Sequence, residues 1–99
     1  MKFKLIAPAV CEFEEALIWY EAQSPNLKAR LLQEFETAQE RILEHPGAWH
    51  PLGGGLRRYR LDRFPYGLIY RIDPQEIVII AIAHLHRSPD YWRDRLSKI

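Results

Sequence analysis

The hydrophobic periodicity changes from helical to strand-like midway along the 99 residues, and this change constrains the fold more than any single motif. Apolar residues recur every three or four positions over residues 10–20 and again over 27–42. Two runs of alternating side chains follow, and then a nearly unbroken apolar run over 77–83. Because helices repeat every 3.6 residues and strands every two, this order predicts two helices and then a strand-rich half.

Both predicted helices carry recognisable ends. Pro8 suits the first turn of the first helix, where its missing N–H would have no partner. Ser24 followed by Pro25 is typical of an N-cap with proline at the first helical position of the second. The His-Pro-Gly sequence at 45–47 ends that helix. A connection of about three residues between the helices predicts an antiparallel hairpin.

The predicted fold class is α+β, with the helical hairpin packed on one face of a small antiparallel sheet of three or four strands. The order is β-α-α-β-β-β with a short C-terminal helix, in a single domain over residues 1–99. The predicted strands are 2–6, 56–62, 64–72 and 77–85, residues 47–55 are a predicted loop, and Ser88 begins the final helix. The predicted core contains Phe13, Leu17, Leu31, Phe35, Ile42 and Ile79.

The helices carry more apolar side chains than one stripe needs, namely Ile18, Trp19, Leu32 and Leu43. Two interpretations remain open for this excess. It is either a wide apolar face within the core or a groove for a partner helix or strand. Trp19 and Trp49 are themselves expected to pack against the domain.

Composition excludes several classes of protein. Cys11 is the only cysteine, which rules out an internal disulfide and leaves too few thiols for a zinc knuckle. The single thiol fits a cytoplasmic protein. The longest apolar run is far shorter than the ~20 residues that span a bilayer, so no membrane association is expected. No metal and no cofactor are expected either.

Charge is unevenly distributed along the chain. Residues 1–50 contain five Lys or Arg and eight Asp or Glu, whereas residues 51–99 contain nine and five. Clustered guanidinium groups recognise phosphate or carboxylate in bidentate fashion, so the arginines at the centre of the basic half predict a site for an anionic partner. The candidate residues are Arg57, Arg58, Arg60 and Arg71. Arg58 and Arg60 share one strand face, opposite Tyr59 and Leu61.

A second candidate cluster follows the last strand. His84 and His86 point to the same side of a strand, and Arg87 and Tyr91 come shortly after them. These residues suit acid–base chemistry, because histidine titrates near neutrality, but they also suit hydrogen bonding that holds a C-terminal turn. Tyr91 and Trp92, with Arg93 and Arg95 beside them, either stack on nucleobases or anchor the final helix.

Five stretches in this order resemble the RelE/ParE superfamily of type II toxin–antitoxin toxins. They are Ser24-Pro25, residues 45–47, Leu56-Arg57, the YGLIYRI sequence at 66–72 and the IIAIAHLHRSPDYW sequence at 79–92. The resemblance spans nearly the whole chain. It implies a small cytoplasmic toxin held inactive by a cognate antitoxin, whose C-terminal segment wraps the toxin's helices and sheet.

The resemblance leaves the target open. RelE-like members cleave mRNA on the ribosome, which would make His84, His86, Arg87 and Tyr91 catalytic and the strand arginines phosphate ligands. ParE-like members inhibit DNA gyrase. The C-terminal sequence is more similar to the ParE-type or plasmid-stabilisation branch, and the central strands lack lysine. The expected function is therefore gyrase inhibition without enzymatic activity. The alternatives are an mRNA endoribonuclease and a non-toxic protein-binding module.

Overall fold

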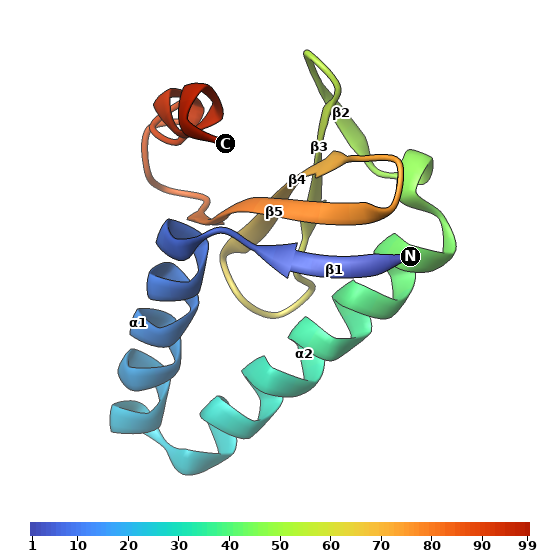
Figure 1. The fold of residues 1–99 in the computed structure, drawn as a ribbon. Helices are drawn as coiled ribbons and strands as arrows, with labels where there is room; N and C mark the ends of the chain where they lie inside the picture. Colours follow the sequence, from blue (N-terminus) through green and yellow to red (C-terminus); the bar gives the residue numbers. More distant parts are fainter.

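Two α-helices, five strands and two 3-10 segments make up the structure, a computed structural model that describes residues 1–99 (Figure 1). In chain order they are β1 (Lys2–Leu5), α1 (Ala7–Gln23), α2 (Pro25–Glu44), η1 (Pro46–Ala48), β2 (His50–Gly53), β3 (Leu56–Arg60), β4 (Tyr66–Ile72), β5 (Glu76–His84) and η2 (Arg93–Lys98). The predicted α+β fold class is confirmed. Neither α-helix combines the length and apolar character that crossing a membrane requires.

Ser24 separates the two helices and terminates both. Its backbone N–H donates to the carbonyl of Tyr20, which ends α1, and its hydroxyl accepts a hydrogen bond from the N–H of Asn26 at 3.2 Å, which begins α2. Pro25 takes the first position of α2, where no N–H is needed. With one residue between them, the helices form the predicted hairpin, and both lie on the same side of the sheet (Figure 1).

The sheet is mixed, with the strand order β1-β5-β4-β3-β2. β1 runs parallel to β5, with Lys2 opposite Glu76 and Leu5 opposite Ile79, while the other neighbours are antiparallel. The prediction of a wholly antiparallel sheet of three or four strands was therefore wrong. A parallel pair needs a long crossover between its strands. The helical hairpin that follows β1 is part of that crossover.

The strand β2 lies within residues 47–55, which were predicted to be a loop. It pairs with β3 at the edge of the sheet, with His50 opposite Arg58. Pro51 has no backbone N–H to donate, which is tolerated on an edge strand. Because proline argues against a strand, the sequence pattern did not indicate one here. Gly53, Gly54 and Gly55 all have positive φ angles, so the turn into β3 needs three glycines.

The C-terminal segment also differs from the prediction. No helix begins at Ser88, and the 3-10 helix η2 begins at Arg93. Trp92 is 2% exposed and anchors the segment, as one of the two interpretations of Tyr91 and Trp92 required. It lines a cleft with Ile69 and Ala83 on the sheet face away from the helices. The C-terminal segment therefore covers part of the face that the helices leave open.

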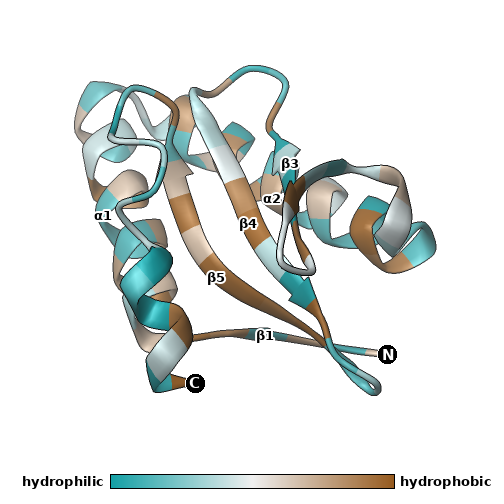
Figure 2. Ribbon diagram, turned by 90° about the horizontal axis from the view of Figure 1, so that it is seen from above, coloured by the Kyte–Doolittle hydropathy of each residue, from teal (hydrophilic) through white to brown (hydrophobic).

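The main core lies between the helices and the sheet, and apolar residues dominate β5 (Figure 2). Leu31, Phe35, Ile42 and Ile79 are buried as predicted. Phe13 and Leu17 are only partly buried, although both pack against the core. Both residues lie on α1, in which only Ala9 and Ala16 are buried.

A β-bulge interrupts the pairing of β5 with β4. Ile69 lies opposite Ala81 while Tyr70 lies opposite Ile79, so Ile80 is an extra residue on β5. The extra residue of a bulge is left unpaired, and the ladder is locally disrupted. The carbonyl of Ile80, at the bulge, and the N–H of Ile82, beyond it, both bond to side chains, past the point where the pairing with β1 ends.

Candidate functional site

The strand register separates the four candidate arginines by face. Arg58 lies opposite Ile69 and Arg60 opposite Gly67, so both share the face of β4 that also carries Arg71. This is the face away from the helices, which the C-terminal segment covers only in part. Arg57 points to the helix side. The predicted alternation of Arg58 and Arg60 against Tyr59 and Leu61 agrees with this register.

Two of these arginines are held by neighbouring groups. The guanidinium of Arg57 donates to the carbonyl of Trp49 at 2.8 Å. Arg71 forms a bidentate pair with Asp73, with N–O distances of 2.7 and 2.9 Å. This hydrogen bonding lowers the pKa of the Asp73 carboxyl. Both side chains therefore already have partners within the chain.

Arg58 and Arg60 remain available to a partner. Arg60 is exposed, and Arg58 is half-buried over Gly67, where a Cβ would meet its Cγ at 3.0 Å. The buried Nε of Arg58 has no hydrogen-bond partner. The candidate anion site therefore reduces to a pair of arginines on the open sheet face.

His84 and His86 lie together at the end of β5. The His84 ring packs edge-on against Tyr66 with centroids 5.2 Å apart, and against His86 at 5.0 Å. The Nδ1 of His84 accepts a hydrogen bond from the backbone N–H of His86 at 3.1 Å. An acceptor nitrogen carries no proton, so this geometry places the proton of a neutral His84 ring on Nε2.

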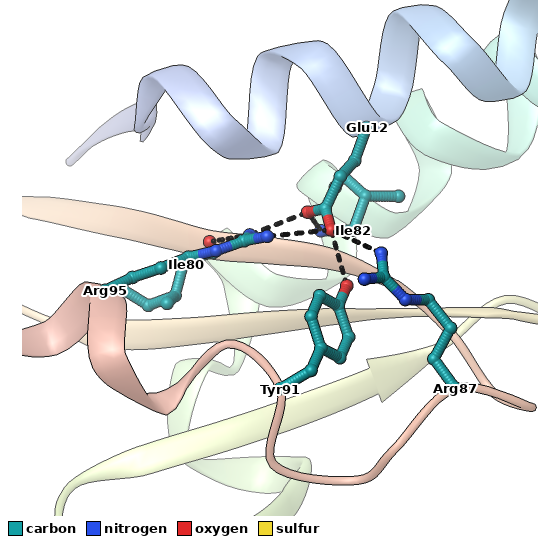
Figure 3. A network of polar contacts seen from close by, with 6 residues as sticks. All are labelled: Glu12, Ile80, Ile82, Arg87, Tyr91 and Arg95. Atoms are coloured by element: carbon teal, nitrogen blue, oxygen red, sulfur yellow. Dashed lines mark hydrogen bonds and ion pairs between the residues drawn. The ribbon is translucent and has the colours of Figure 1, made fainter.

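Glu12 of α1 is the centre of the most connected polar network in this region, shown in Figure 3. Its carboxylate accepts hydrogen bonds from the hydroxyl of Tyr91, from both terminal nitrogens of Arg95 at 2.8 and 3.0 Å, and from the backbone N–H of Ile82 at 3.1 Å. Arg87 approaches the same carboxylate at 3.6 Å. Glu12 therefore ties α1 to β5 and to the C-terminal segment.

The same network closes the edge of β5 beyond the bulge. Glu12 bonds the N–H of Ile82, and Arg95 donates to the carbonyl of Ile80 at 3.0 Å. These side chains satisfy backbone groups that a longer β1 would have paired. Sequence reasoning missed Glu12 and gave Arg95 no such role, because the two residues are 83 positions apart and no local pattern connects them.

Two of the candidate residues predicted from the sequence, Tyr91 and Arg87, take part in this network. Burial, and then the hydrogen bond to Glu12, raises the pKa of Tyr91 well above its ordinary value. The Arg87 guanidinium lies over the Tyr91 ring, 3.8 Å from its centroid. Tyr91 therefore stays protonated, and its hydroxyl already donates a hydrogen bond to Glu12. Both facts disfavour its use as a base.

The candidate site residues predicted from the sequence do not all lie in one place. His84, Arg87, Tyr91 and Arg58 line one cleft of about 150 Å³. Arg71 lies elsewhere, because Tyr66 pairs with His84 while Arg71 pairs with Val78. Tyr66 and Arg71 are five positions apart along β4, or about 17 Å at the usual rise of a strand. No group of three or more His, Cys, Asp or Glu side chains is arranged to hold a metal ion.

The helices expose the apolar excess noted in the sequence. Ile18 is 68% and Trp19 60% exposed, and Leu32 and Leu43 are exposed as well. The expectation that Trp19 packs against the domain was wrong, whereas Trp49 packs edge-on against Tyr59 at 4.7 Å. Of the two interpretations of the excess, exposure favours a surface that a partner covers.

Comparisons with known proteins agree with this architecture. A family described as "ParE toxin of type II toxin-antitoxin system, parDE" matches residues 7–89. Among solved structures, a chain described as "Chromosomal ParDE TA system from P. aeruginosa" has a similar fold, with a TM-score of 0.71 and 23% sequence identity. The match covers 87% of this chain and 97% of that chain. None of the curated proteins is significantly similar to this chain.

Proposed function

Because this chain belongs to the ParE toxin family of type II toxin–antitoxin systems, we propose that it inhibits DNA gyrase and that a cognate antitoxin neutralises it. The observation that best supports inhibition by binding is the dispersal of the groups that RNA cleavage would need. Arg71 is paired with Asp73 about 17 Å along β4 from His84, and the Tyr91 hydroxyl is bound to Glu12. Catalysis of phosphate transfer requires acid, base and cations around one phosphorus atom.

Two surfaces support neutralisation by an antitoxin segment. One is the exposed apolar side of the helices, which includes Ile18 and Trp19. The other is the sheet face carrying Arg58 and Arg60, which suits acidic residues of the partner. Arg57 is not part of this surface, because it points to the helix side and donates to the Trp49 carbonyl.

Ribosome-dependent mRNA cleavage is the second candidate, supported by the cleft that Arg58 shares with His84 and Arg87. These side chains supply two cations and one imidazole at one place. The cleft is small, about 150 Å³, and Arg87 within it already pairs with Glu12. For these reasons gyrase inhibition is preferred.

The toxicity test uses induced expression with and without the neighbouring small gene, reading DNA supercoiling beside translation. We expect growth arrest, relaxed plasmid DNA and rescue by the neighbouring gene. His84→Gln keeps much of the ring's shape, so toxicity is expected to remain nearly intact. Loss of toxicity in a folded His84→Gln protein, together with cleaved transcripts in cells expressing the original chain, would establish the ribonuclease instead. Unaffected growth would favour the non-toxic binding module.

Antitoxin binding is tested with a pair of charge variants. Arg58→Ala combined with Arg60→Ala is expected to weaken binding about 2- to 30-fold, since each exposed charge contact is worth roughly 0.2–1 kcal/mol. Arg30→Ala removes one exposed arginine from α2 and serves as the control. Equal affinities of the double variant, the control and the original chain in low salt would exclude these arginines from the interface.

A further inference from the structure

Trp19 is the largest exposed apolar side chain of the helices, and it borders a cleft rather than an open surface. The cleft has a volume of about 330 Å³. Glu12, Glu15, Ala16 and Trp19 form its α1 side, and Tyr66, Ile82, His84 and Arg87 form its other side. We call it the Trp19 cleft. Its α1 residues follow the i, i+3, i+4, i+7 spacing, so they form one continuous stripe of the helix.

The Trp19 cleft lies where the sheet lacks a neighbouring strand. β1 pairs with β5 only as far as Ile79, and Ile82 and His84 come after that point. Aromatic rings border the cleft, with Trp19 on one side and the Tyr66 ring packed against His84 on the other. Ala16 and Ile82 add an apolar lining, and both are buried. The lining therefore combines aromatic and aliphatic surface.

On the α1 side of the cleft, the one free charge is the carboxylate of Glu15. Glu15 is exposed and takes part in none of the ion pairs of the structure. The Glu12 carboxylate is shared by Arg95, at 2.8 and 3.0 Å, and by Arg87 at 3.6 Å, and Arg87 also lies over Tyr91. Residues 5–27, which include all of α1, contain four glutamates and no Lys or Arg. A cation that approaches along α1 therefore meets the unpaired carboxylate of Glu15 and no basic residue on the helix, while Arg87 lies on the opposite side of the cleft.

We propose that the Trp19 cleft binds an arginine or lysine side chain of the cognate antitoxin. An aromatic face attracts a cation through its negative quadrupole, and tryptophan does so most strongly. Glu15 adds an opposite charge at the rim, while the apolar lining accepts the aliphatic stem of a long basic side chain. This proposal rests on the proposed function for the identity of the partner. Its chemistry is the reverse of the arginine pair on the sheet, which suits acidic residues.

The first test uses a small probe and does not depend on toxicity or on the antitoxin. N-acetyl-arginine N-methylamide is titrated into the ¹⁵N-labelled protein while the indole N–H resonance of Trp19 is followed by NMR. N-acetyl-glutamine N-methylamide is the neutral control probe. We expect saturable shifts of the Trp19 resonance with the arginine probe and much weaker binding of the glutamine probe. Equal binding of the two probes, or no binding of either, would overturn the proposal.

Matched variants localise the effect. Glu15→Gln is expected to weaken binding of the arginine probe about two- to fivefold, as for an exposed ion pair. Trp19→Leu is expected to weaken it about fivefold, as for an exposed cation–π contact. Glu14→Gln removes the same charge from the neighbouring position, which does not line the cleft, and serves as the control. Equal effects of Glu14→Gln and Glu15→Gln would reduce the result to a general acidic field and overturn the site.

The second test measures the affinity of the same variants for the purified cognate antitoxin. Glu15→Gln is expected to weaken this complex and Glu14→Gln to leave it unchanged. A complex that is insensitive to both variants would refute the proposed occupant while leaving neutralisation intact. Absence of any complex would refute the proposed function while leaving the probe result to stand. Concentration-dependent shifts of Trp19 without probe would identify a second copy of this chain as the occupant and overturn the proposal.

Discussion

Replacement of Glu12 by alanine tests whether one carboxylate holds the C-terminal segment on the domain. The side chain of Glu12 is only 12% exposed and that of Arg95 only 17%, so their pair is largely shielded from water. The change leaves Arg95 without its carboxylate and also removes the acceptors of the Tyr91 hydroxyl and the Ile82 N–H.

The expected cost in free energy of unfolding is about 3–5 kcal/mol, the usual range when one partner of a buried ion pair is removed. Glu12→Gln keeps the shape and one acceptor oxygen but loses the charge, so about 1.5–3 kcal/mol is expected. Glu14→Ala on the exposed side of α1 is the control and should stay within about 0.5 kcal/mol. Against a typical total stability of 5–15 kcal/mol, the loss in Glu12→Ala is large.

Urea unfolding and native-state hydrogen exchange measure the effect. Beyond the lower stability, the amide of Ile82 should exchange faster in Glu12→Ala, because that N–H loses its acceptor. Combining Glu12→Ala with Arg95→Met removes both charges, so the double variant should recover at least about 1 kcal/mol relative to the sum of the single changes. Strict additivity of the two changes, or a cost below about 1 kcal/mol for Glu12→Ala, would refute the role assigned to this network.

Three further predictions follow from burial and from pKa values. Leu31→Ala should lower the free energy of unfolding by about 2–5 kcal/mol in urea, with an unchanged m-value, because Leu31 is 1% exposed in the core. Burial raises the pKa of Tyr70 to about 12, so the fold should lose stability as the pH rises from 10 to 12, and Tyr70→Phe should flatten this dependence. Arg71 lowers the pKa of Asp73, so its stabilising pair is complete above about pH 4 and is lost as the pH falls further; acid unfolding of Asp73→Asn should show a weaker dependence there.

The sequence predicted the elements that local periodicity defines and missed those that distant contacts define. The α2 stripe and the apolar β5 are strong local patterns, and Leu31, Ile42 and Ile79 are buried accordingly. The parallel pairing of β1 is invisible locally, because short alternating strands look alike in either direction. The edge strand β2 was missed because Pro51 argues against a strand.

The position of Trp19 around the helix already indicates its exposure, although it was expected to pack against the domain. At 100° per residue, Trp19 and Ile18 lie roughly 120° and 140° from Phe13 around α1, outside the stripe that packs inward. Glu12 offered no such signal. Its partners lie 70 to 83 residues away, and their roles became visible only when the bulge at Ile80 and the end of β1 were known.

The pairing of β1 with β5 has a consequence for the order of folding during synthesis. The first strand has no neighbour in the sheet other than β5, whose residues begin more than seventy positions later. Arg95, which completes the Glu12 network, lies 83 positions after Glu12. Contacts of such long sequence separation form late, because the intervening chain must be ordered first. A chain emerging from the ribosome can form its helical hairpin early, but it acquires the complete sheet, and any activity that depends on it, only after β5 has been synthesised.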